Sequence, residues 1–109
     1  MSTLIPRGNI ARIFAMTLVF NPASVATATT AEQTVTVNGL LPGDFVILQK
    51  PTNTAGFGIV NARVSAANTL AVTVVNPTAG SVDAASETYQ LLVFRPEMSQ
   101  SQLPAAFVA

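Results

Sequence analysis

The side chains that could perform acid–base or nucleophilic chemistry are few and scattered in this sequence. There is no histidine and no cysteine, so the commonest general base, the thiolate nucleophile, the usual zinc ligands and a disulfide framework are all missing. The acidic residues are spread along the chain at Glu32, Asp44, Asp83, Glu87 and Glu97. Asp83 and Glu87 stand close in sequence, but nothing near them indicates a raised pKa or a companion base. We therefore predict that the protein is not an enzyme.

Two further patterns could hold a ligand, and both are incomplete. Gly56-Phe57-Gly58 contains a GxG pattern, but the third glycine and the following helix of a phosphate-binding loop are missing. The segment 76–87 lacks the alternating oxygen ligands of a calcium loop. We predict no cofactor and no metal ion, and we interpret the glycine pair as a flexible bend.

Two residues are candidates for contacting a partner protein. Phe57 lies between two glycines in a predicted loop, so we expect it to project outward. The other aromatic residues are expected to fill the core: Phe14, Phe20, Phe45, Tyr89 and Phe94. Arg63 stands at an alternate position of an otherwise apolar strand. It is either a residue of the solvent face or an interface anchor, a role that the planar guanidinium favours.

The elements that must position these residues read as short strands. Alternating or continuous apolar runs bounded by Pro, Gly and Asn predict strands at 10–20, 32–37, 45–48, 59–64, 70–75 and 87–94. Pro42-Gly43 fits a type II turn. Leu70, Val72 and Val74 should share one face of their strand, and Tyr89, Leu91 and Val93 one face of theirs.

The fold class predicted from these runs is all-β. β-branched residues dominate and no window shows a helical period. Six or seven strands separated by turns predict a small antiparallel β-sandwich or jelly-roll-like domain. We place this single domain at residues 9–95, with extended N- and C-terminal arms at 1–8 and 96–109. The arms carry apolar candidate contacts for a partner protomer or a shell subunit: Leu4, Ile5, Met98, Leu103, Phe107 and Val108.

Composition and charge restrict the partners. The 109 residues are 50% hydrophobic and only 9% charged, with a formal net charge of zero, so we expect no binding to nucleic acid or to an anionic membrane. The run Ile10–Phe20 follows Arg7 in the manner of a signal peptide, but it is too short to span a bilayer and contains Arg12. We expect it to be a strand. A surface with so few charges is expected where much of it is buried against other subunits.

The segment from Thr30 to Pro96 resembles the small β-rich decoration or cement proteins that coat the capsids of tailed bacteriophages. The likeness is carried by Gly39-Leu40 with Gly43-Asp44, Lys50-Pro51, the run ARVSAANTLAV at 62–72, Asn76, and Glu87-Thr88-Tyr89. It implies a structural virion protein that binds the capsid exterior and stabilises contacts between major capsid protein subunits, often as a dimer or trimer homo-oligomer. Before assembly it would lie in the host cytoplasm. The resemblance transfers no functional residue.

The alternative is another phage tail, fibre or carbohydrate-binding β-module. Carbohydrate-binding surfaces usually offer exposed Trp and Tyr rings, and this chain has no Trp and one Tyr. The composition therefore favours the capsid-binding function.

Overall fold

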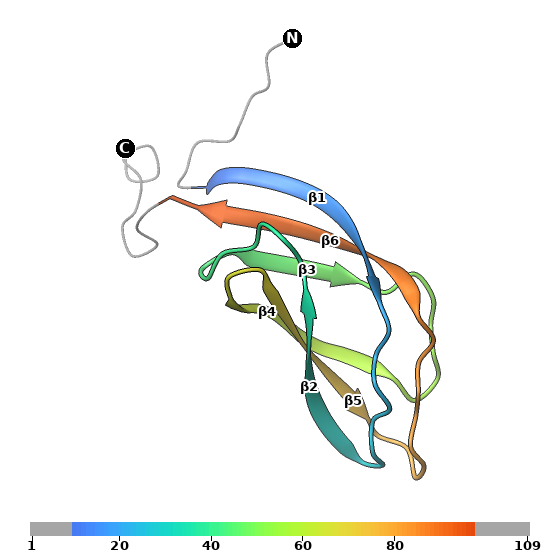
Figure 1. Ribbon diagram of the computed structural model, residues 1–109. Coiled ribbons are helices and arrows are strands. Elements are labelled where there is room, and N and C mark those ends of the chain that lie inside the picture. Colours follow the sequence, from blue (N-terminus) through green and yellow to red (C-terminus); the bar gives the residue numbers. More distant parts are fainter. Residues whose placement is uncertain (1–9, 98–109) are drawn as a thin grey trace, which may run out of the picture.

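The computed structural model describes residues 10–97, which form six strands in two antiparallel sheets and contain no helix (Figure 1). The strands are β1 (Ile10–Phe20), β2 (Thr29–Thr36), β3 (Phe45–Gln49), β4 (Gly58–Ala66), β5 (Thr69–Asn76) and β6 (Glu87–Pro96). The predicted all-β fold is confirmed, and each predicted strand is present, β1 with the predicted bounds and the other five with slightly shifted ends. The candidate contacts in the predicted arms all lie outside the described residues: Leu4, Ile5, Met98, Leu103, Phe107 and Val108.

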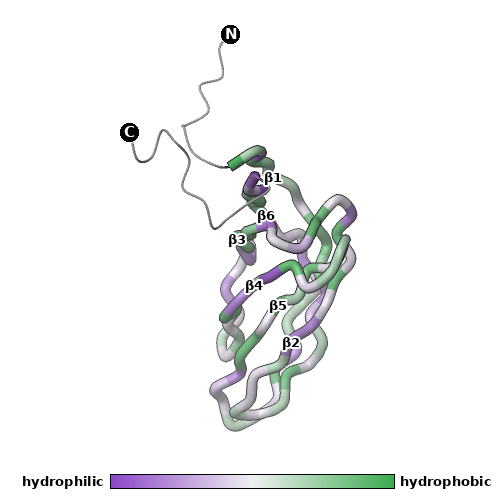
Figure 2. The backbone as a smooth tube through the Cα atoms, turned by 90° about the vertical axis from the view of Figure 1, so that its left-hand side faces the viewer, coloured by the Kyte–Doolittle hydropathy of each residue, from purple (hydrophilic) through white to green (hydrophobic). Residues whose placement is uncertain are grey.

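The two sheets have the strand orders β1-β6-β3 and β2-β5-β4. Every connection except the β4–β5 hairpin passes from one sheet to the other. Figure 2 shows the sheets as two layers of the molecule. A chain that alternates between sheets in this way can pack their inner faces together, which is the arrangement of a β-sandwich.

The core lies between the inner faces of the two central strands. From β5 it takes Leu70, Val72 and Val74, and from β6 it takes Tyr89, Leu91 and Val93; all six are at most 1% exposed. Both sets share a face as the period-2 pattern predicts. The ring of Phe20 packs edge-on against Tyr89 with 5.4 Å between centroids. The central strand of each sheet is therefore the best buried, whereas the flanking strands contribute mostly partly buried side chains, with Phe20 of β1 as a buried exception.

The corner before β3 is the turn that the sequence predicts. Asp44 N–H donates to the carbonyl of Leu41 at 3.1 Å, and Gly43 has φ of +98°. A type II turn requires positive φ at its third residue, a conformation that glycine adopts without strain. This turn sets the point at which β3 begins.

The side-chain amide of Asn76, at the end of β5, is buried and connects two segments by hydrogen bonds. Asn76 is 0% exposed, and its Nδ2 donates to the carbonyls of Val25 at 3.0 Å and Gly80 at 2.8 Å. Its Oδ1 accepts from the N–H of Thr78 at 2.9 Å. Because a buried backbone carbonyl without a partner is costly, Asn76 holds the segment before β2 against the loop after β5.

Within residues 10–97, no helix is long and apolar enough to cross a membrane.

Candidate protein-binding face

The outward side of the β1-β6-β3 sheet is mostly apolar. In the strand register, Ile13, Phe94 and Phe45 lie opposite one another, and Ala15, Leu92 and Ile47 form the next row. We call these six residues the apolar face. Ile13, Phe45 and Ile47 are 50%, 54% and 57% exposed. Isolated exposed apolar residues are ordinary, but neighbouring rows of them are typical of protein-binding surfaces.

The next row along the same sheet is polar. Thr17, Gln90 and Gln49 lie opposite one another, and together with part of the apolar face they line a groove of about 430 Å³. The apolar face is therefore bordered by groups that can form hydrogen bonds, the usual arrangement of an apolar interface centre with a polar rim.

The outward side of the other sheet has a different character. Glu32 of β2 and Arg63 of β4 reach across β5, with Arg63 Nε and Nη2 each 2.9 Å from a carboxylate oxygen of Glu32. The Arg63 hydrogen bond lowers the pKa of Glu32. Arg63 lies on the outward side of its sheet with its side chain 55% exposed, a position that fits a solvent-face residue and an interface anchor alike. The two sheets thus differ in their outer residues, since one carries two rows of apolar residues and the other carries an exposed ion pair together with the exposed Val60.

A partly buried ion pair between Arg95 and Asp44, of which only the Asp44 carboxylate is fully buried, fixes one end of the apolar face from behind. Arg95 Nε lies 3.0 Å from Asp44 Oδ1 and its Nη2 lies 2.8 Å from Oδ2. The same Nη2 donates to the carbonyl of Gly39 at 2.6 Å, and the N–H of Leu41 donates to Asp44 at 3.0 Å. The Arg95 hydrogen bond lowers the pKa of Asp44, and the Leu41 amide adds to this effect. Charge-assisted bonds of this bidentate kind hold β3 and β6 in one geometry.

This ion pair explains the first correction to the sequence analysis. Phe45 was expected in the core but is exposed. Neighbouring residues of a strand point to opposite sides, and Asp44 turns inward to Arg95, so Phe45 points outward. The inward side of β3 is filled instead by Val46 and Leu48. Because every residue from Phe45 to Leu48 is apolar, the sequence contained no alternation from which to choose the buried side.

Phe57 is the second correction. It was expected to project toward a partner but is only 9% exposed and belongs to the core. The preceding Gly56 has φ of +78°, and a Cβ there would lie 2.6 Å from Thr78 Cγ2. The glycine therefore permits a close approach of two loops that turns the Phe57 ring inward. The glycine pair marks tight packing rather than a flexible bend.

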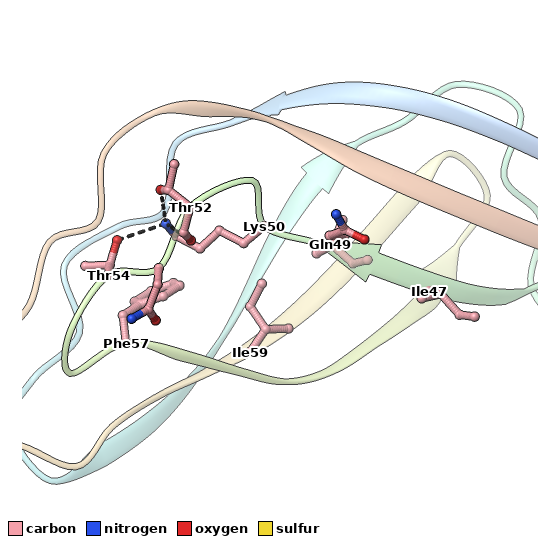
Figure 3. A pocket seen from close by; sticks show the side chains of 9 residues that line it. Ile47, Gln49, Lys50, Thr52, Thr54, Phe57 and Ile59 are labelled. Carbon is pink, nitrogen blue, oxygen red and sulfur yellow. Dashed lines mark hydrogen bonds between the residues drawn. The ribbon is translucent and has the colours of Figure 1, made fainter.

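The loop beside Phe57 contains Lys50, the single lysine of the chain (Figure 3). Lys50 Nζ lies 2.7 Å from Glu87 Oε1 and donates to Thr54 Oγ1 at 2.8 Å and to the carbonyl of Thr52 at 2.9 Å. These bonds occupy the donors of an ammonium group. The Lys50 hydrogen bond lowers the pKa of Glu87. Lys50 thus braces the loop after β3 against β6, and the groove of about 370 Å³ at this loop presents its apolar wall at Phe57 and Ile59.

Within residues 10–97, no three acidic residues come together in a group that could hold a metal ion. Glu32, Asp44 and Glu87 each have a separate basic partner. Each of these three ion pairs joins two segments that are distant in sequence.

Sequence reasoning missed the apolar face. The signal in the sequence was the presence of apolar residues at the outward positions of β1, β6 and β3. It was not distinctive, because the core-facing residues of the same strands are equally apolar. Comparisons of the chain with protein-family models, with curated proteins and with solved structures found no match.

Proposed function

We propose that this protein is a structural virion protein of a tailed bacteriophage that binds the capsid exterior and stabilises contacts between major capsid protein subunits. The observation that carries the proposal is the difference between the two outer faces. The apolar face of β1-β6-β3 leaves Ile13, Phe45 and Ile47 at least half exposed, whereas the opposite face carries the exposed Glu32–Arg63 ion pair. A protein that adheres to a shell needs one such side and leaves the other in water.

The contribution of such a protein is thermodynamic. A molecule that binds only the assembled shell shifts the assembly equilibrium toward the shell by mass action, with no turnover. The apolar face supplies buried area, at about 25 cal/mol for each Å² of apolar surface removed from water. The chain's zero net charge means that long-range electrostatics contribute little to attraction or repulsion. The resemblance over Thr30 to Pro96 names the class of partner, a capsid subunit.

The carbohydrate-binding alternative finds no support in the aromatic residues. The single tyrosine, Tyr89, is 0% exposed in the core, and the chain has no tryptophan. No tyrosine or tryptophan ring is therefore offered for stacking on a sugar.

The test adds purified protein to particles of the encoding phage that lack it and measures the temperature at which the genome is released. We expect a higher release temperature with the wild-type protein and no increase with Ile47→Lys, which places a charge in the apolar face. Val60→Lys is the matched control, because Val60 is 62% exposed on the other sheet. Equal release temperatures with and without wild-type protein would contradict the proposal. If Val60→Lys alone failed to raise the release temperature, the binding surface would be the β2-β5-β4 sheet and not the apolar face.

A further inference from the structure

The sandwich has four edge strands, and three of them are protected against pairing with another strand. β3 is only five residues long and is followed by Lys50-Pro51. β4 has two register shifts, between Ile59 and Asn61 and between Val64 and Ala66. Short length, bulges and proline are devices by which proteins prevent edge-to-edge association.

β2 is protected by charge and by a neighbouring segment. Glu32 lies in the middle of the strand and is held there by Arg63. The next residue, Gln33, forms two hydrogen bonds with the backbone of Ala23. Its Oε1 accepts from the N–H of Ala23 at 2.8 Å, and its Nε2 donates to the carbonyl of Ala23 at 3.0 Å. A charge in mid-strand opposes the addition of a further apolar strand.

β1 carries such protections only at its start, where a register shift lies between Ile10 and Arg12 and where Arg12 is charged. From Arg12 to Phe20 it pairs with β6 through nine consecutive residues without a shift, and after Arg12 it contains no charged residue and no proline. Within the described part of the chain, its other side has no partner strand. A long, regular, apolar edge of this kind is a template for pairing with another strand.

We propose that β1 pairs antiparallel with β1 of a second copy of this chain, joining two three-stranded sheets into one six-stranded sheet. The order across the pair would be β3-β6-β1 followed by the partner's β1-β6-β3. The two apolar faces would then form one continuous surface, because Ile13 and Ala15 lie on the same side of β1. The inference concerns the free protein and does not depend on what the apolar face binds.

The sequence of β1 suits pairing with itself. Residues directly opposite each other in a sheet share a face, so core-facing side chains must meet core-facing ones. This condition places the two-fold axis on a residue rather than between two residues. Pairing the whole run Arg12–Phe20 centres the axis on Met16. Sliding one strand along the other by two residues, in either direction, centres the axis on Ala15 or on Thr17.

Charge is compatible with this pairing. With the axis on Met16, Arg12 lies opposite Phe20 of the partner subunit, far from the second Arg12. Two copies of a chain with zero net charge also do not repel each other at long range. A second copy is therefore an occupant whose pattern and charge both fit this edge.

The size of the contact between the two β1 strands, which we call the seam, sets the expected affinity of the dimer. Nine residues at about 3.4 Å each give a seam roughly 30 Å long, and a sheet layer is about 10 Å thick. The resulting contact is on the order of 300 Å² per copy, compared with about 800 Å² per partner in a standard stable interface. We expect a weak dimer that is populated at high protein concentration.

The test uses the fact that the chain contains no cysteine, so each introduced thiol is the only one in its molecule. Ala15→Cys and Thr17→Cys are prepared in the full chain at exposed positions of β1 and mildly oxidised singly and as a mixture. A disulfide requires Cα atoms roughly 4.4–6.8 Å apart. A disulfide between two Ala15→Cys chains would show that the two-fold axis lies on Ala15, and one between two Thr17→Cys chains would show that it lies on Thr17. A disulfide that joins one Ala15→Cys chain to one Thr17→Cys chain would show that the axis lies on Met16.

Val60→Cys on β4 and Ile47→Cys in the apolar face are the controls, both at exposed positions. We expect a linked dimer in one of the three β1 preparations and none in the controls, with a dimer of the wild-type chain seen by sedimentation as concentration rises to about 1 mM. A wild-type chain that stays monomeric at that concentration overturns the inference. An oligomer that gives no disulfide at Ala15→Cys or Thr17→Cys also overturns the inference. The same holds for an oligomer that is linked through Ile47→Cys or Val60→Cys.

Discussion

Arg95 and Asp44 form a bidentate ion pair, with N–O distances of 3.0 and 2.8 Å. The pair lies on the inner side of the sheet, behind Phe94 and Phe45 at one end of the apolar face. Phe94 precedes Arg95 and Phe45 follows Asp44, and the two rings lie opposite each other in the register of β6 and β3. Since neighbouring side chains of a strand point to opposite sides, the charges that turn inward oblige the rings to turn outward. The ion pair therefore positions the surface that we propose binds a partner.

Asp44→Asn should lower the free energy of unfolding by roughly 1–2 kcal/mol, because the charge-assisted bonds to Arg95 become ordinary hydrogen bonds and one acceptor oxygen is replaced by a donor. Urea unfolding followed by circular dichroism measures the change. Glu32→Gln is the matched control, since it alters an exposed ion pair that should contribute little. An equal loss in both variants would show that burial of the Asp44 pair is not the cause.

Stability should be flat near neutral pH and fall in acid. Asp44 and Glu87 have pKa values below their ordinary values of 3.8 and 4.5, so the unfolded chain binds protons before the folded one does. The stabilisation is complete above those ordinary values and is lost as the pH falls through the lower folded values. Urea midpoints measured between pH 7 and pH 2 test this, and the acid loss should be smaller in Asp44→Asn. A wild-type midpoint independent of pH below 4 would contradict the expectation.

Asn76→Ala should destabilise the domain by about 2–3 kcal/mol, since it leaves the carbonyls of Val25 and Gly80 without their amide donor in a buried site. Asn53→Ala, in an exposed loop position, is the control and should change the unfolding free energy little. Thermal and urea unfolding measure both variants. The account of Asn76 fails if the two substitutions have the same effect.

Tyr89→Phe should leave stability unchanged or raise it by up to about 1 kcal/mol. The Tyr89 hydroxyl is buried and has no hydrogen-bond partner among the described residues, and its removal abolishes a desolvation cost. Burial raises the pKa of Tyr89, and Glu87 adds to this effect. The folded protein should therefore lose stability above about pH 10, where tyrosine ionises when unfolded, and Tyr89→Phe should lose less. Clear destabilisation by Tyr89→Phe at pH 7 would indicate an undetected partner.

Gly56→Ala should destabilise the domain by roughly 1–3 kcal/mol. The new Cβ would stand 2.6 Å from Thr78 Cγ2 at a residue with φ of +78°, which adds a steric clash to backbone strain. Gly80→Ala is the control, because no atom lies within 4 Å of a Cβ at that position. Differential scanning calorimetry compares the two midpoints, and the control should melt close to the wild type. Equal midpoints for Gly56→Ala and the wild type would refute the tight loop contact.

The local pattern of the chain was sufficient for the strands and for part of the core. Leu70, Val72 and Val74 alternate with smaller or more polar residues, and Pro42-Gly43 encodes its own turn, so their conformations depend on neighbours in sequence. The predicted strand Ile10–Phe20 has the same bounds in the structure. These features follow from backbone geometry, which acts over a few residues.

Only the tertiary structure decided which side of an apolar strand faces water. Phe45 and Ile47 are as hydrophobic as Val46 and Leu48, and their outward direction depends on Asp44 meeting Arg95, a residue 51 positions away. The burial of Phe57 depends in the same way on Gly56 approaching Thr78. The free edge of β1 depends on the strand order, in which β6 covers one side of β1 and no described strand covers the other. Contacts between distant segments choose among alternatives that the local pattern leaves equal in energy, so the apolar face and the edge emerge only when the sheets are assembled.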